Sequence, residues 1–180
     1  MKKTEVIPFE KKVPDISEIA LELNSDDFQT KKKYNFNSNK ESVSIFKPEN
    51  EEYVNVFLKI LSYHLYKPFY NSLKIDPEAY KKYKADLAAF NYSNEPVCWI
   101  ECLERDYEKI EFICKHMPIE EIILVEISND IDVYLNELRK KVHYKYHDFI
   151  SVVNFDPQIA YYIDPQEVVV IKDWYEVYHL

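Results

Sequence analysis

Glycine is missing from this chain of 180 residues. The P-loop and the dinucleotide-binding turn of the Rossmann fold both need glycine, because the backbone must approach the phosphates closely. Enzymes that cradle ATP in these ways are therefore excluded. Positions with a positive φ must be filled by other residues, and we expect Asn or Asp there, within 35–39 and 91–94 in particular.

Cysteine is scarce and long apolar runs are missing. The three cysteines, Cys98, Cys102 and Cys114, make an odd number in a chain with no export signal, which predicts reduced thiols. No stretch approaches the ~18 consecutive apolar residues that cross a bilayer, and mixed charge follows Met1. We therefore expect a cytoplasmic protein without a membrane partner.

Acidic residues outnumber basic ones, and the formal net charge is −9. This charge repels a polyanion unless basic residues gather on one face, so it argues weakly against nucleic acid as a partner. Hydrophobic residues make up 47% of the chain and aromatic residues 16%, which excludes a disordered chain. We expect one domain over 1–180, in which 1–40 supply peripheral strands and loops and 42–180 form the core.

The spacing of apolar residues predicts an α/β fold with a mixed sheet flanked by helices. A strand over 42–46 precedes a helix whose first turn holds Glu49 and Glu51 and which ends near Pro68. Further along we expect a loop or short helix over 66–84, a β-hairpin of 85–90 and 96–103, a helix from Tyr107 to Pro118, a parallel strand at 122–125, a helix from Asp130 to Val142, and strands at 149–153, 160–163 and 168–171.

One carboxylate, Glu101, lies within an apolar strand. A charge there is costly to remove from water, so it needs a partner, a metal ion or a path to solvent. Alternation along the strand places Trp99 on the face of Glu101 and the cysteines Cys98 and Cys102 on the other face. Asp86, in the neighbouring strand, could bring a second acid to Glu101, and paired carboxylates suit Mg²⁺. A lysine beside them would stabilise an anionic transition state.

These acids also have simpler structural explanations. Asp86 could be a solvated carboxylate at the edge of a strand, and Glu101 could form a structural salt bridge with Arg105 or Lys109. Glu51 could be an acid that only complements the dipole of the first helical turn. At this point the sequence leaves the structural and the metal-binding interpretations open.

Four short segments of the chain are similar to sequence motifs that occur together in one protein family. The Ala-Asp-Leu-Ala of 85–88 looks like a Pro-Asp/Glu-x-Trp segment, and the Trp-Ile-Glu of 99–101 looks like a Trp-Ile-Glu-Leu strand at the matching distance. The helix start at 47–51 and the Trp-Tyr-Glu-Val of 174–177 are similar to further parts of that pattern. Over roughly 42–180 the chain thereby resembles the YaeQ family of small bacterial proteins, placed in the PD-(D/E)XK nuclease-like superfamily. The resemblance implies a restriction-endonuclease-like PD-(D/E)XK core.

The resemblance also implies a function, the Mg²⁺-dependent hydrolysis of phosphodiesters in nucleic acid. It makes Glu51, Asp86 and Glu101 the metal ligands, and it makes Asp86, Glu101 and Lys109 the catalytic residues. The motif lysine would fall at Leu103, so its role passes to Lys109 or to Arg105. Because this position departs from the family pattern, the alternative is a catalytically inactive member of the fold that acts as a nucleic-acid- or protein-binding module.

A basic segment near residue 140 alternates with aromatic residues. Its candidate nucleic-acid-binding residues are Arg139, Lys140, Lys141 and Lys145. Such a segment could follow a phosphate backbone and stack bases. The alternative is a helix end that complements the helix dipole, followed by an amphipathic strand. A protein partner on a tyrosine-rich acidic surface is a further possibility.

A zinc site is a weaker candidate. The cysteines together with His116 match none of the usual zinc spacings. We therefore expect thiols packed in the core.

Overall fold

The computed structural model describes residues 33–37, 42–47, 51–159 and 174–180. Within these residues, six strands form one sheet in the order β3-β4-β5-β6-β7-β8. The strands are β3 (Lys74–Ile75), β4 (Leu87–Phe90), β5 (Pro96–Cys102), β6 (Glu121–Ile127), β7 (Ile150–Phe155) and β8 (Tyr175–His179). The β5-β6 and β6-β7 pairs are parallel and the other pairs are antiparallel. The expected mixed α/β fold is confirmed.

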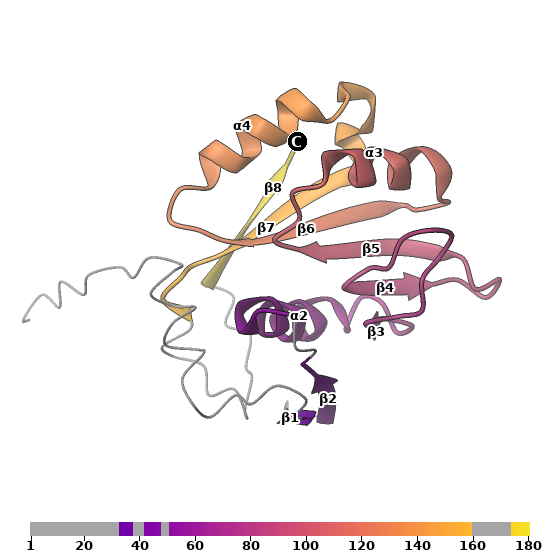
Figure 1. Ribbon diagram of the computed structural model, residues 1–180, viewed down its shortest axis with the longest axis vertical. Helices are drawn as coiled ribbons and strands as arrows, with labels where there is room; N and C mark the ends of the chain where they lie inside the picture. The colour runs from indigo at the N-terminus through magenta and orange to yellow at the C-terminus, as the bar shows by residue number, and fades with distance from the viewer. Residues whose placement is uncertain (1–32, 38–41, 48–50, 160–173) are drawn as a thin grey trace, which may run out of the picture.

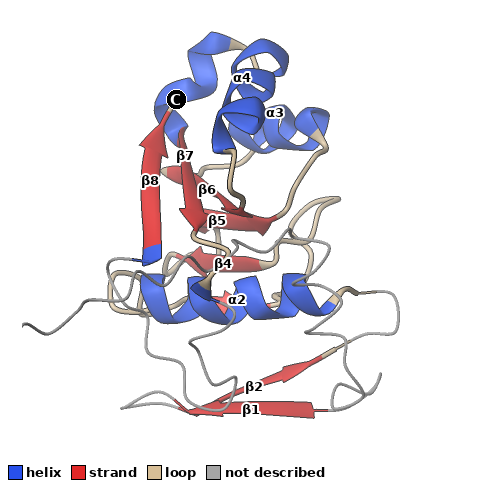
Figure 2. Ribbon diagram, turned by 90° about the vertical axis from the view of Figure 1, so that its left-hand side faces the viewer, coloured by secondary structure: helices blue, strands red, loops and turns tan. Residues whose placement is uncertain are grey.

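Helices cover both faces of this sheet. Helix α2 (Tyr53–Tyr66) lies on one face, whereas α3 (Tyr107–His116) and α4 (Ile131–Lys141) lie on the other (Figure 1). A separate antiparallel pair, β1 (Lys33–Asn37) and β2 (Ser42–Phe46), lies on the far side of α2 from the sheet (Figure 2). None of the helices in the described ranges is long and apolar enough to cross a membrane.

The core is divided by the sheet into two clusters. Alternate residues of β5 serve the two sides: Cys98, Ile100 and Cys102 pack with α2, and Trp99 packs with α3 and α4. All three cysteines are free, and Cys98 and Cys102 are buried. The alternation therefore separates Glu101 from the neighbouring thiols, as the sequence predicts.

The predicted hairpin is confirmed, and it shows how the chain turns without glycine. Strands β4 and β5 pair across the turn of 91–95, in which Asn94 has φ 59°. Asp76 also has a positive φ, but so do Lys81 at 55° and Leu103 at 57°. The expectation that Asn or Asp fills every such position is therefore wrong. At Leu103 the backbone N–H donates to Val125 O at 2.9 Å, and this tertiary bond helps to offset the steric cost of the left-handed region.

Two other details differ from the expectations. Helix α2 begins at Tyr53, so Glu51 lies before its first turn. The segment expected as an amphipathic strand instead contains a 3-10 helix, η1 (Tyr144–Phe149), before β7 begins at Ile150. The side chain of His143 accepts a hydrogen bond from Lys145 N, a local cap that competes with extended backbone.

The remaining predictions for elements have mixed outcomes. The helices expected from Tyr107 and after Asp130 and the parallel strand at 122–125 are confirmed. The segment of 66–84, expected to be a loop or short helix, contains the short strand β3. The strands predicted at 160–163 and 168–171 lie outside the described residues, as do 1–32 and Glu49.

Candidate functional site

A buried lysine forms the centre of the site. Lys59 lies in the middle of α2, and its side chain is only 4% exposed. Its Nζ lies 2.5 Å from Glu51 Oε1, 2.8 Å from Asp76 Oδ1 and 3.0 Å from Asp86 Oδ1. We call these four residues the Lys59 cluster.

Three separate parts of the chain bring the carboxylates to Lys59. Glu51 lies just before the N-cap residue of α2, Asp76 follows β3, and Asp86 precedes β4. A backbone hydrogen bond from Asp76 N to Asp86 O, 2.8 Å long, ties the last two together. Asp86 Oδ2 also accepts a hydrogen bond from Cys102 N at 2.8 Å, which anchors the cluster to the end of β5.

Glu101 belongs to a second group on the opposite face of the sheet. It is 3% exposed, and its Oε1 accepts a 2.5 Å hydrogen bond from Trp99 Nε1. Lys109 Nζ, from α3, lies 2.8 Å from the same oxygen and 2.6 Å from Glu104 Oε2. We call the ion pair of Glu101 and Lys109 the Glu101–Lys109 pair. Arg105 does not join it, because its guanidinium contacts both carboxylate oxygens of Glu126.

Burial and charge compete at each of these groups. Burial raises the pKa of Glu101 to about 7, although the charge of Lys109 acts in the opposite direction. The nearby charge of Asp86 raises this pKa further. Burial lowers the pKa of Lys59, but the surrounding carboxylates outweigh burial and hold that pKa well above its ordinary value. Burial raises the pKa of Glu51.

A cavity of about 480 Å³ opens onto the Lys59 cluster. It is lined by Glu51, Glu52, Asn55, Lys59, Asp76, Lys84, Ala85, Asp86, Cys102 and Leu103. Glu101 and Lys109 are not among these residues. The structure thus groups Glu51 with Asp86 and groups Glu101 with Lys109, and the two groups use lysines from helices on opposite faces of the sheet.

The Lys59 cluster does not fit a magnesium ion. Its Nζ stands between the carboxylates, and two of the three N···O distances, 2.8 and 3.0 Å, are ordinary for an ammonium hydrogen bond. Mg²⁺ would need oxygens at about 2.0–2.1 Å. Throughout the described part of the chain, no group of three or more His, Cys, Asp and Glu side chains could hold a metal ion. This statement includes the cysteines and His116.

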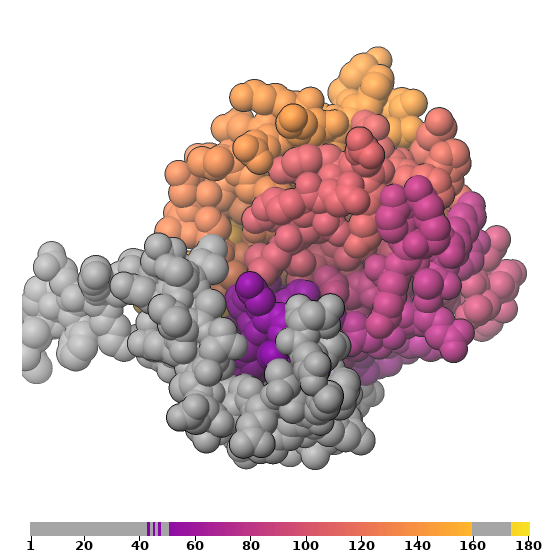
Figure 3. All heavy atoms as spheres, viewed as in Figure 1, coloured from indigo at the N-terminus to yellow at the C-terminus, as the bar shows by residue number. Residues whose placement is uncertain are grey.

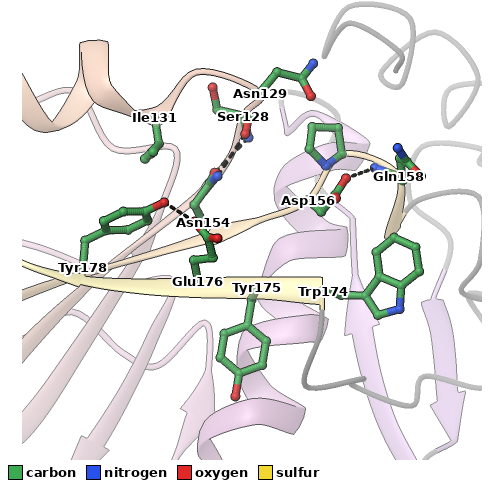
Figure 4. A pocket seen from close by; sticks show the side chains of 11 residues that line it. Ser128, Asn129, Ile131, Asn154, Asp156, Gln158, Trp174, Tyr175, Glu176 and Tyr178 are labelled. Atoms are coloured by element: carbon green, nitrogen blue, oxygen red, sulfur yellow. Dashed lines mark hydrogen bonds between the residues drawn. The ribbon is translucent and has the colours of Figure 1, made fainter. Parts of the chain in front are cut away.

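A second cavity lies at the carboxyl ends of β6 and β7. It measures about 280 Å³ and is shown with its lining residues in Figure 4. Its polar groups bind one another: Asn154 donates to Ser128 O and accepts from Ser128 N, both at 2.9 Å. Asp156 accepts from Gln158 N at 2.8 Å. The hydroxyl of Tyr178 likewise donates a hydrogen bond to Glu176, so these polar groups are engaged with one another.

The basic segment lies at the end of α4 and in η1. Its four candidate residues, Arg139, Lys140, Lys141 and Lys145, are all exposed. Tyr144 is 78% exposed, and its ring stacks on His143 with the centroids 4.7 Å apart. In Figure 3 this part of the chain forms the orange surface at the top of the molecule, away from α2.

Sequence reasoning missed Lys59 and Asp76. A signal for Lys59 was present, because a charged residue between Leu58 and Ile60 in an apolar helix is as unusual as Glu101 in its strand. Asp76 had no comparable signal, since it lies in a polar connection rich in lysine.

The site and fold together define a class: a mixed α/β protein with buried carboxylates held by lysines at the end of a β-hairpin. No protein-family model matches the chain, and no curated protein sequence matches it. Solved structures do. A YaeQ protein from Pseudomonas syringae has a TM-score of 0.59 at 14% identity, covering 82% of this chain and 88% of that chain. A YaeQ protein from Xanthomonas axonopodis pv. citri has a TM-score of 0.54 at 11% identity, covering 77% and 82%.

The resemblance to YaeQ proteins that the sequence indicates is therefore confirmed at the level of the fold. At sequence identities of 11% and 14%, the comparison shows only that the backbones follow a similar path. The activity and the roles of individual residues must be argued from the site itself.

Proposed function

We propose that this chain is a YaeQ-like protein with a restriction-endonuclease-like PD-(D/E)XK core, and that it acts as a nucleic-acid-binding module without metal-dependent hydrolysis. Support for the core comes from Asp86, just before β4, and Glu101, near the end of β5, in a β-hairpin that is followed by a helix and a parallel strand. Support for the lack of hydrolysis comes from the lysines that already bind both carboxylates.

The observation that carries the proposal is the exposed basic segment. Four cationic side chains and the exposed ring of Tyr144 lie within seven consecutive positions of α4 and η1, 139–145. Cations of this kind bind phosphates, and an exposed ring offers a face on which a base can stack. Because the segment lies across the sheet from the acidic Lys59 cluster, the net charge of −9 does not prevent a local attraction.

A titration with nucleic acid tests this proposal. Fluorescence anisotropy would compare labelled single-stranded and double-stranded DNA and RNA at several salt concentrations. We expect affinity to fall as salt rises, and we expect Lys140→Ala/Lys141→Ala to weaken binding and to reduce the slope of log K against log salt by about one to two.

The matched control is Lys67→Ala/Lys74→Ala, which removes the same charge outside the basic segment. Its salt dependence should equal that of the unaltered protein. Equal losses in both double variants would mean that net charge alone governs binding. No binding of any of the four nucleic acids at low salt would refute the proposal and favour a protein-binding module.

Hydrolysis is a second candidate function, and one observation favours it. The register of β4 and β5 pairs Leu87 with Ile100, which brings the backbone of Asp86 close to that of Glu101, the partner of Lys109. The catalytic set under this proposal is Asp86, Glu101 and Lys109, with Mg²⁺ as cofactor. Cleavage of mixed nucleic acids with Mg²⁺ or Mn²⁺, abolished in both Glu101→Gln and Lys109→Met, would establish it in place of the inactive module.

A further inference from the structure

We propose that the ammonium group of Lys59 is a permanent internal replacement for a divalent cation, so that this protein holds its carboxylates together without taking up metal. The inference goes beyond nucleic-acid binding, because it concerns the opposite face of the sheet and does not require the basic segment. Three features of Lys59 support it: the three carboxylate contacts, the burial of the side chain, and its position in the middle of α2.

The number of carboxylate contacts equals the number of N–H donors of an ammonium group. Lys59 Nζ carries three N–H donors, and carboxylate oxygens of Glu51, Asp76 and Asp86 lie 2.5, 2.8 and 3.0 Å away. Three carboxylate oxygens thus surround an ammonium group that has three donors, and the contact with Asp76 is a hydrogen bond. A divalent ion would bring the same three chain segments together through oxygen ligands.

Burial makes the replacement hard to reverse. The side chains of Lys59 and Glu51 are 4% and 10% exposed, and those of Asp86 and Asp76 are 17% and 32% exposed. Lys59 arises from the middle of α2, where the residues on both sides are buried. A metal ion could displace the ammonium only by leaving a buried charge without partners, which is strongly unfavourable.

The Lys59 cluster has a net negative charge, and removal of Lys59 would make that charge more negative. The three carboxylates outnumber the one buried ammonium, and a further cation, Lys84, lies 3.7 Å from Asp76 and is 55% exposed. Without Lys59, the carboxylates would form a strongly anionic cage beside an open cavity of about 480 Å³. Such a cage has the hard oxygen donors that divalent cations prefer.

The first experiment uses the unaltered protein. Calorimetric titration with MnCl₂, MgCl₂ and CaCl₂ should record no binding of one ion per chain at millimolar concentrations. The thermal midpoint should shift no more than in KCl of equal ionic strength. Uptake of one ion that is abolished by Asp86→Asn would overturn the proposal, whatever the variants below do.

The second experiment opens the cage. Lys59→Ala should lower the thermal midpoint, and millimolar Mn²⁺ or Ca²⁺ should restore several degrees of it, because the ion takes the place of the missing ammonium. Lys59→Arg keeps a cation in place and should show no response to metal. The double variant Lys59→Ala/Asp86→Asn should lose most of the response, since one carboxylate ligand is gone.

A folded Lys59→Ala protein that does not respond to any of the three ions would contradict the proposal. If Lys59→Ala does not fold without metal, recovery of native circular dichroism on refolding with Mn²⁺ supports it. If it folds in neither condition, Lys59→Gln, which keeps most of the side-chain length, replaces it. The same metal response is then required of that variant.

Discussion

Glu101 is a carboxylate whose protonation should change near neutral pH. Its pKa is raised from 4.5 to about 7 by burial, against the opposing charge of Lys109. Between these two values the folded protein keeps a proton that the unfolded chain releases. The free energy of unfolding should therefore decrease as the pH rises from about 4.5 to about 7, and the loss is complete above pH 7.

Glu101→Gln removes this pH dependence because glutamine does not titrate. We expect its free energy of unfolding, relative to the unaltered protein, to increase by about 1–3 kcal/mol between pH 4 and pH 8. Urea unfolding at several pH values measures this difference. Glu108→Gln, on the exposed side of α3, is the matched control and should show no such trend. A parallel pH profile for Glu101→Gln and the unaltered protein would disprove the assignment.

The residues of the site were only partly predictable from the sequence. Glu101 stands out because it interrupts an apolar strand, and the hairpin register explains why Asp86 lies near it. The partner of Asp86 could not be predicted in the same way. Lys59 is distant in sequence, and its contact with Asp86 depends on how α2 packs against the end of β5.

At the level of elements, the two N-caps of α3 and α4 provide a matched comparison. Asp106 precedes α3, and its Oδ1 accepts a hydrogen bond from Lys109 N at 3.0 Å. Asp130 occupies the same position before α4, but its side chain makes no capping hydrogen bond. The same residue type therefore performs the capping role at one helix and not at the other.

Asp106→Ala should lower the free energy of unfolding by about 0.5–2 kcal/mol, because the first turn of α3 loses a hydrogen-bond acceptor. Asp130→Ala should have a smaller effect. Chemical denaturation of the two variants in one buffer compares them directly. Equal losses would show that the capping bond of Asp106 contributes nothing beyond the charge near a helix dipole.

Helix and strand predictions succeeded where the apolar period was regular. Helix α3 shows the spacing of one apolar face, and β6 is apolar on both faces because helices cover both sides of the sheet. The prediction failed at η1, where alternating aromatic and basic residues are typical of a strand. There the local hydrogen bond of His143 favours a tight turn.

For the whole molecule, the sheet is shared by the two core clusters. Leu58 in α2 belongs to one cluster and Leu138 in α4 belongs to the other, and both are fully buried. The strand β5 supplies residues to each cluster, so neither half of the core is complete without the sheet. A single domain over 1–180 stays a prediction, which unfolding experiments can test.

Leu58→Ala and Leu138→Ala should each lower the free energy of unfolding by about 2–5 kcal/mol through lost burial and the cavity left behind. In each variant, far-ultraviolet circular dichroism and tryptophan fluorescence should report one coincident urea transition. The loss in the double variant should equal the sum of the two single losses in the free energy of unfolding within about 0.5 kcal/mol, because the two side chains belong to different core clusters. Separate transitions for the two probes would contradict a single domain.

The two outer strands of the six-stranded sheet have a further consequence. At one margin, β3 is only two residues long, and at the other, β8 carries the exposed polar side chains Glu176 and His179. A short edge strand offers another polypeptide few free backbone N–H and C=O groups, and exposed charged side chains discourage pairing with a further strand. Edge strands of this kind disfavour edge-to-edge pairing with the sheet of another copy. The native protein should therefore resist fibril growth through this sheet, even in concentrated solution.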